Sequence, residues 1–457
     1  MLPDGVSSFI DKNREIFVSD LMRFLEIPSV STLSEHEKDV ERAAEWILEQ
    51  FQACRISGRI YPTARHPIVL ARSPEVRGAP VLLVYGHYDV QPPDPLEEWK
   101  TPPFSPDRRD GCVYARGATD DKGQFLTYIE AVRSVLGAGL ELPINLVFLV
   151  EGEEEIGSSN LEKFLTDHIA ELRADAVAIS DSSQFAPGIP AITYGLRGLC
   201  YLQLDMQGPR FDLHSGSFGG LIENPAHALA TILAKMKNSD GTIALPGFYD
   251  DVLPLEQWER EEMASLPLDE EKLGDYLGVS RFTGEPGYSL LERKGARPTL
   301  DVNGIWGGFS GEGAKTIIPG KAGAKVSMRL VPNQTPEKIT ELFQRFVSEN
   351  TPPGITIKIT DLYGANPVLV SRNTAAMRAA ERAIEAGFGK KPVFIREGGS
   401  IPVVNLIKKH LGQENILLLG WGNPDDGAHS PNERFSLDDF HRGIRSAAAL
   451  FYEIARG

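Results

Sequence analysis

The chain has 457 residues, of which 42% are hydrophobic and 24% charged, as in a globular protein rather than a disordered or fibrous one. This length exceeds the usual size of a single hydrophobic core, so we expect two or three domains. The 47 Lys and Arg against 63 Asp and Glu give a net charge of -16, and a surface of this charge repels nucleic acid and anionic membranes.

Neither apolar runs nor cysteines indicate a membrane or secreted protein. No apolar run approaches the roughly 18 residues of a membrane span, and the first residues lack the pattern of a signal peptide. The three cysteines, Cys54, Cys112 and Cys200, form no C-x-x-C pair, which argues against a disulfide scaffold or a thiolate metal site. We therefore expect a cytoplasmic protein with free thiols and no membrane or nucleic-acid partner.

The first part of the chain, from about residue 39 to 190, alternates between helical and strand-like patterns. Amphipathic spacing predicts helices, and short apolar runs predict strands. The helices cover residues 40–54 and 125–136, and the strands cover 81–85, 144–150 and 176–180. This alternation predicts a layered α/β sheet.

The pattern changes near Tyr194. A strand is predicted over residues 199–206 and a helix over 225–237, followed by a stretch at 239–299 that is rich in acids, glycine and proline. A separate α+β insertion is the simplest account.

The first pattern then returns towards the end of the chain. Helices are predicted over residues 374–386 and 437–456, with an apolar strand at 416–419. We therefore predict a discontinuous catalytic domain formed by residues 1–198 and 365–457, interrupted by an inserted domain at 199–364.

Acidic residues and histidines follow strand-like runs in five places, where open α/β sheets gather their ligands. Because strand residues alternate in direction, His87 and Asp89 lie on the same side, and Asp89 can orient the ring of a metal-bound His87. The other four groups are Asp120 with Asp121, the glutamates at 151, 153, 154 and 155, Asp181, and Asp425 with Asp426 and His429.

Carboxylates and imidazoles together suit Zn, Mn or Co, and two such ions about 3.5–4 Å apart form a common hydrolytic centre. Two divalent ions and three carboxylate ligands leave one positive charge, which a bound hydroxide would neutralise while acting as the nucleophile. A further glutamate would act as general base, and the spacing does not choose among the four. Each of these groups taken singly also has a structural interpretation. His87 could be a hydrogen-bonded residue at a strand end, Asp181 a helix cap, and the glutamates part of a solvated loop.

Other catalytic motifs are not supported. The string GGFSGEGAKT misses the spacing of a phosphate-binding loop by one residue, because Ala314 precedes Lys315. Neither a G-x-S-x-G serine motif nor an H-E-x-x-H zinc helix occurs.

Ten strings in order carry a family resemblance: GHYDVQP, RGATDDKG, EGEEEIGS, ISDS, YGLRG, DLHSGSFGG, GEGAKTIIP, RLVPNQ, REGGSIP and DDGAHS. The chain closely resembles the metallopeptidase family of aminoacylases, succinyl-diaminopimelate desuccinylase and glutamate carboxypeptidases. Within it, the chain is most similar to the branch of carnosinases and cytosolic non-specific dipeptidases. The resemblance covers about residues 27 to 433, and it implies a zinc-exopeptidase-like three-layer α/β/α catalytic domain with an inserted ferredoxin-like lid and dimerisation domain.

The resemblance also implies a metal-ligand set and a general base. His87 and Asp181 would bind one metal ion, Glu155 and His429 the other, and Asp120 both. Matching the EGEEEIGS string makes Glu154 the general base.

Further residues would act on the substrate. His214 would reach into the partner subunit's active site and stabilise the developing oxyanion, and Thr316 would cross the same interface. Arg329, Gly399 and Ser400 would hold the terminal carboxylate of the substrate.

The predicted function is therefore that of a cytoplasmic, homodimeric dipeptidase that depends on two Zn or Mn ions. It would hydrolyse the amide bond of dipeptides with a free C-terminal carboxylate. The alternative is an N-acyl-amino-acid deacylase, of the aminoacylase or desuccinylase type, with the same centre.

Overall fold

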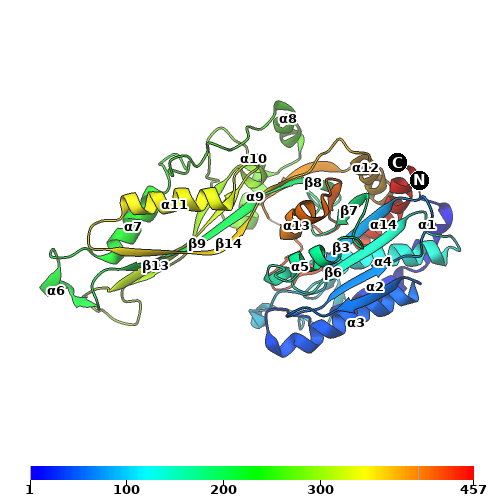
Figure 1. The fold of residues 1–457 in the computed structure, drawn as a ribbon, viewed down its shortest axis with the longest axis horizontal. Helices are drawn as coiled ribbons and strands as arrows, with labels where there is room; N and C mark the ends of the chain where they lie inside the picture. Colours follow the sequence, from blue (N-terminus) through cyan, green and yellow to red (C-terminus); the bar gives the residue numbers. More distant parts are fainter. Residues whose placement is uncertain (1, 400) are drawn as a thin grey trace. The chain divides into compact units, whose positions relative to one another are not determined.

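The computed structural model describes residues 2–399 and 401–457, which form two compact units (Figure 1). The first unit contains residues 2–194, 370–395 and 401–457, and the second contains 195–369 and 396–399. The short segment 396–399 is fixed within the second unit, where the Nε atom of Arg197 donates to the carbonyl oxygen of Gly398 at 3.2 Å. No described helix has the length and apolar character needed to cross a membrane.

The first unit contains most of a mixed sheet with the strand order β1-β2-β6-β3-β7-β17-β8-β15, in which β16 also pairs with β8. Strand β15 and the last residues of β8 and β16 are assigned to the second unit. The centre of this sheet, β6-β3-β7-β17, is parallel. The strands are β1 (Ser57–Tyr61), β2 (Ile68–Arg72), β3 (Val81–His87), β6 (Asn145–Glu151), β7 (Ala176–Ile179), β8 (Ala191–Leu196), β15 (Val368–Leu369), β16 (Val393–Glu397) and β17 (Ile416–Leu419). The apolar runs that predict strands in this part of the chain are thus confirmed, since buried strands in parallel sheets are continuously apolar.

Helices cover both faces of this sheet, which confirms the three-layer arrangement. Strand β1 shows this on its two faces. On one face Gly58 packs against Leu48 of α3, and on the other the ring of Tyr61 meets Phe164 of α5 edge-to-face. The helices of this unit are α1 (Asp4–Lys12), α2 (Arg14–Leu25), α3 (Glu37–Ala53), α4 (Lys122–Gly137), α5 (Leu161–Asp167), α12 (Ala375–Phe388), α13 (Pro402–Leu411) and α14 (Leu437–Arg456). A small sheet pairs β4 (Asp107–Arg109), β5 (Cys112–Tyr114) and β18 (Arg434–Ser436).

Helix α4 begins at Lys122, three residues before the predicted start at residue 125. Its first three residues, Lys122, Gly123 and Gln124, carry no apolar side chain, so the hydrophobic pattern does not reveal them. Gly123 lies in the first turn, and a Cβ atom there would come within 2.0 Å of the carbonyl oxygen of Ala118. The close approach requires glycine at this position.

We expect Gly123→Ala to lower the free energy of unfolding by about 1–3 kcal/mol, because the added methyl group forces the backbone apart. Urea denaturation measures this change. Gly5→Ala in α1 is the matched control, because a Cβ atom there meets only an ordinary 3.8 Å contact with Ala138. Equal stabilities for the two variants would contradict the packing argument.

The main elements of the second unit follow one another in the chain as β9-α7-β11-β13-α11-β14. Its larger sheet has four strands in the order β11-β13-β9-β14, all antiparallel. This is the predicted ferredoxin-like α+β arrangement. The strands and helices are β9 (Gly198–Gln207), β11 (Thr299–Gly307), β13 (Lys321–Leu330), β14 (Thr356–Ala365), α7 (Pro225–Lys235) and α11 (Pro336–Asn350). Residues of β9 alternate between buried and half-buried, because one face of the sheet packs into the apolar core beneath α7 and α11.

Smaller elements complete the second unit: β10 (Leu213–His214), β12 (Ile317–Ile318), α6 (Ser215–Phe218), α8 (Gln257–Ser265), α9 (Glu270–Leu277) and α10 (Leu290–Gly295). Helices α8 to α10 lie in the acidic stretch at 239–299. Their starts carry capping side chains, as in the reciprocal pair formed by Ser289 and Glu292 at α10.

Candidate metal centre

The carboxyl ends of three neighbouring parallel strands bring polar side chains to one edge of the sheet. His87 is the last residue of β3, Glu151 is the last residue of β6, and Asp181 follows β7 by two residues. Because β3 lies between β6 and β7, these side chains come from adjacent positions in the sheet. This is the edge at which α/β sheets gather ligands.

Two groups of potential metal ligands lie at this edge and share one residue. His87, Asp120 and Asp181 offer ligand atoms within 4.8 Å of one another, and so do Asp120, Glu155 and His429. The two oxygens of Asp120 face different histidines: Oδ1 lies 3.3 Å from Nε2 of His87, and Oδ2 lies 2.9 Å from Nε2 of His429. Glu155 Oε2 also lies 3.3 Å from Nε2 of His429. A shared carboxylate with one oxygen towards each group suits a bridging ligand.

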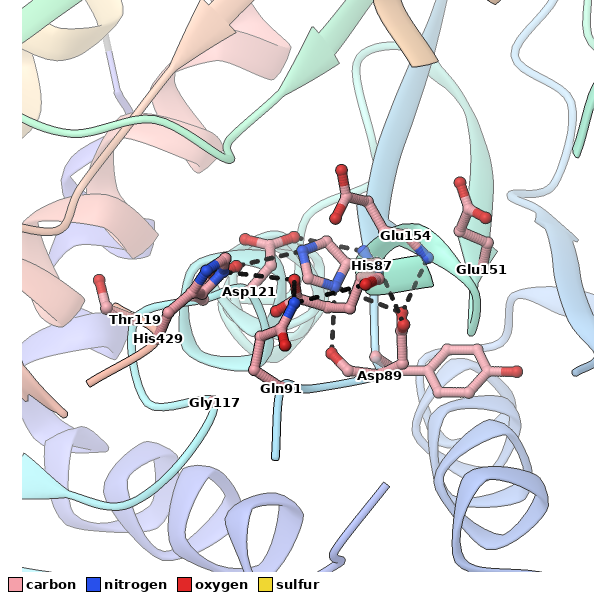
Figure 2. Close-up of polar contacts among 12 residues, drawn as sticks. His87, Asp89, Gln91, Gly117, Thr119, Asp121, Glu151, Glu154 and His429 are labelled. Carbon is pink, nitrogen blue, oxygen red and sulfur yellow. Dashed lines mark hydrogen bonds and ion pairs between the residues drawn. The ribbon is translucent and has the colours of Figure 1, made fainter. Parts of the chain in front are cut away.

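Asp89 connects His87 to the glutamate loop (Figure 2). The carbonyl oxygen of Asp89 lies 3.1 Å from Nδ1 of His87, and its carboxylate lies 3.5 Å from the same atom. The carboxylate accepts hydrogen bonds from the backbone N–H groups of Glu154 and Glu155. Asp89 thus turns Nε2 of His87 towards Asp120 and also fixes the turn that carries both glutamates.

The donor set fits divalent cations. The buried Nε2 atom of His87 has no hydrogen-bond partner among the described residues, although Oδ1 of Asp120 lies 3.3 Å away. Burial raises the pKa values of Glu154 and Asp181 well above their ordinary range, because an ionised carboxylate loses its solvation here. Contacts with Asp120 and Glu155 raise the pKa of His429 to about 11, so this imidazole also lies in a strongly negative field.

The backbone around two ligands adopts conformations that are uncommon for residues with side chains. His429 has a φ of 61°, in the left-handed region, and its side chain is 56% exposed. The short helix Glu154–Ile156 ends at Gly157 and Ser158, which have φ values of 89° and 51°. Such conformations cluster at functional sites because the surrounding structure must hold them in place.

Hydrogen bonding separates the four glutamates of the EGEEEIGS string. Glu151 accepts from the hydroxyls of Tyr85 at 2.7 Å and Ser158 at 2.9 Å. Glu153 accepts from the backbone of His66 and from side chains that include Asn160. Among the described residues, no donor bonds to the side chain of Glu154, while Glu155 belongs to the second ligand group.

Sequence reasoning missed three residues around the site. Gln91 donates to Glu155 Oε2 at 2.8 Å, and it stands in the GHYDVQP string. Glu433 and Arg116 form a buried ion pair beside Asp120, with 2.8 Å between Nη1 of Arg116 and Oε2 of Glu433. Their positions are 317 residues apart, and no local pattern points from one to the other.

The predicted substrate-binding residues that the structure describes belong to the second unit. His214 ends β10, and its Nδ1 accepts from the backbone N–H of Gly216 at 3.0 Å. Thr316 is adjacent, since its carbonyl oxygen accepts from the N–H of Ser215 at 3.1 Å. Arg329 is half-buried in β13, and Gly399 follows β16; the predicted residue Ser400 lies outside the described residues.

Comparison with known proteins gives consistent matches. The model of peptidase family M20/M25/M40 matches residues 83–453. The Cys-Gly metallodipeptidase dug1 of Schizosaccharomyces pombe is 33% identical over 476 residues, which cover 99% of this chain and 98% of that protein. The β-Ala-His dipeptidase of Mus musculus is 33% identical over 397 residues, which cover 85% of this chain and 80% of that protein.

Solved structures agree. The structure of the dipeptidase Dug1p from Saccharomyces cerevisiae superimposes with a TM-score of 0.86 at 32% identity and covers 99% of this chain and 98% of that one. The structure of human carnosine dipeptidase 1 gives a TM-score of 0.88 at 29% identity, with complete coverage of both chains.

Proposed function

Because this chain belongs to peptidase family M20/M25/M40, as the ten ordered strings led us to expect, we propose that it is a metal-dependent dipeptidase acting on dipeptides with a free C-terminal carboxylate. The observation that carries this proposal is the pair of ligand groups that share Asp120. The relatives named above are dipeptidases and align with most of the chain. They do not favour the alternative of an N-acyl-amino-acid deacylase.

The proposed cofactors are two divalent ions, Zn or Mn. His87 and Asp181 would hold one, Glu155 and His429 the other, and Asp120 both. When bound, such ions polarise a carbonyl group and lower the pKa of water.

Glu154 is the proposed general base. Its carboxylate would accept the proton of the attacking water and then deliver it to the departing amine. Two features support this role. No described residue donates a hydrogen bond to the side chain of Glu154, and its backbone N–H donates to Oδ1 of Asp89 at 3.2 Å. A base held in this way keeps its orientation while its oxygens remain available to water.

His214 is proposed to donate a hydrogen bond to the oxygen that becomes negative during attack. Arg329, Gly399 and Ser400 would bind the carboxylate of the substrate, because a guanidinium group forms strong charge-assisted hydrogen bonds with this group. Such an anchor at a fixed distance from the scissile bond favours short substrates.

We further propose that a homodimer shares each active site, with His214 and Thr316 contributed by the partner copy. Exposed large apolar side chains of the second unit support this proposal, because a partner copy would bury them. They include Phe211, Phe218, Leu221, Ile222, Ile305, Trp306 and Phe309. A cytoplasmic location remains our proposal and is consistent with the three free cysteines.

Chelation and substrate assays test the proposed function. We expect 1,10-phenanthroline or EDTA to abolish dipeptide hydrolysis, and added Zn or Mn to restore it, because five ligand side chains would lose their ions. Cys-Gly and β-Ala-His should be assayed beside N-acetyl and N-succinyl amino acids. Activity that survives chelation would refute the metal centre, and cleavage of the N-acyl substrates alone would refute the dipeptidase assignment.

A further inference from the structure

The carboxylate of Glu433 is completely buried and accepts four hydrogen bonds from one distant segment. Its Oε2 accepts from Nη1 of Arg116 at 2.8 Å and from the backbone N–H of Gly117 at 2.9 Å. Its Oε1 accepts from the backbone N–H groups of Thr119 at 2.9 Å and Asp120 at 3.1 Å. One side chain thus accepts from four donors of the loop that ends at the shared carboxylate; Gly117 and Thr119 of this loop are labelled in Figure 2.

The main chain of Glu433, close to His429 in the sequence, bonds to the same distant segment. Glu433 lies four positions after His429, and its carbonyl oxygen accepts from the N–H of Ala115 at 3.1 Å. Immediately beyond it, Arg434 pairs with Tyr114 in the antiparallel ladder between β18 and β5. Main-chain and side-chain bonds of Glu433 therefore tie the segment 115–120 to the segment 429–433.

The two ligand groups differ in how far they depend on this connection. His87 ends a central strand and Asp181 follows another, so the sheet itself holds two of the three side chains of the first group. In the second group, Glu155 lies in a short helical turn and His429 in a turn with a left-handed backbone. The position of His429 relative to Asp120 therefore depends on contacts between loops.

We propose that Glu433, together with Arg116, is a positioning residue that holds Asp120 against His429 and thereby sets the affinity for the second ion, bound by Asp120, Glu155 and His429. This inference rests on the proposed two-metal function. Arg116 contributes to this positioning because it is also buried, and its Nη2 donates to the carbonyl oxygen of Pro92 at 3.2 Å. Loss of either partner leaves the other as an uncompensated buried charge, which disturbs the loop.

The decisive variant is Glu433→Gln, which keeps the size of the side chain but removes its charge and places an amide N–H against donors. Mn and Zn binding is measured by calorimetry and by metal analysis after dialysis. We expect the affinity for one ion to fall about 10- to 100-fold, as is typical when a residue supporting a metal ligand is lost. The other ion should bind as in the wild type, and kcat should fall while KM for a dipeptide stays unchanged.

Glu453→Gln provides the matched control. Glu453 is also buried and bonds to Arg382 at 2.6 Å and Arg456 at 2.9 Å, but it lies on α14, and no described bond joins it to a ligand residue. This variant should lose thermal stability and still bind both ions with wild-type affinity.

The outcomes separate this inference from the proposed function. If Glu433→Gln binds both ions normally, or loses both equally, the positioning role is refuted even where stability falls. Should this variant fail to fold, Arg116→Lys carries the test, because lysine keeps the charge but lacks the second donor group, and the same selective loss of one ion is expected. A wild-type protein that binds no ions would instead refute the proposed function.

Discussion

Replacing Glu154 by glutamine is expected to reduce kcat by about 10²- to 10⁴-fold, the usual contribution of a positioned general base. The amide cannot accept the proton of the attacking water, whereas its size and backbone contacts are preserved. The backbone N–H of Glu154 would still donate to Asp89, so Glu155 and His87 should keep their positions. Both ions are therefore expected to remain bound.

Steady-state kinetics with a dipeptide, together with metal analysis of the same sample, measure this effect. Glu162→Gln is a suitable control, because Glu162 is exposed on α5 and its described ion pairs are with Lys409 and His410, away from the ligand groups. Its kcat should match that of the wild type. A Glu154→Gln enzyme with near-normal kcat would eliminate Glu154 as the base, and a loss of ions with activity would assign it to metal binding instead.

Replacing His214 by alanine should lower kcat by about 10²- to 10³-fold, the typical cost of removing one donor to a developing oxyanion. His214 belongs to the second unit and is not a member of either ligand group, so both ions should stay bound. Its one described side-chain bond, from Gly216, lies within its own turn, so the fold of the second unit should survive.

Mixed dimers test whether His214 acts across the subunit boundary. In a dimer of His214→Ala with Asp120→Ala, one of the two sites combines an intact ligand set with an intact His214 from the other copy. The separated heterodimer should therefore recover about half of the wild-type activity, as expected for a two-fold symmetric pair. Each variant alone serves as the control. A heterodimer as inactive as its parents would contradict the shared site.

Local pattern in the sequence determined much of the fold. Parallel strands buried on both faces require continuous apolar runs, so β3, β6 and β7 are recognisable without a structure. Strand alternation also places His87 and Asp89 on one side. The start of α4 was not predicted, because its first residues are polar or glycine and are buried only through tertiary packing.

The hydrogen-bond partners that distinguish the four neighbouring glutamates are visible only in the tertiary structure, whereas the roles proposed for Glu154 and Glu155 come from the family resemblance. Glu151 accepts a hydrogen bond from Tyr85, 66 positions away, and Glu153 accepts one from His66, 87 positions away. Glu433 finds its partners 313 to 317 positions away, where no periodicity links the two segments. Periodicity arises from contacts between near neighbours in the chain, and it therefore predicts elements. The hydrogen-bond partners of a buried carboxylate come from segments far apart in the chain. They can therefore be identified only once the spatial arrangement of those segments is known.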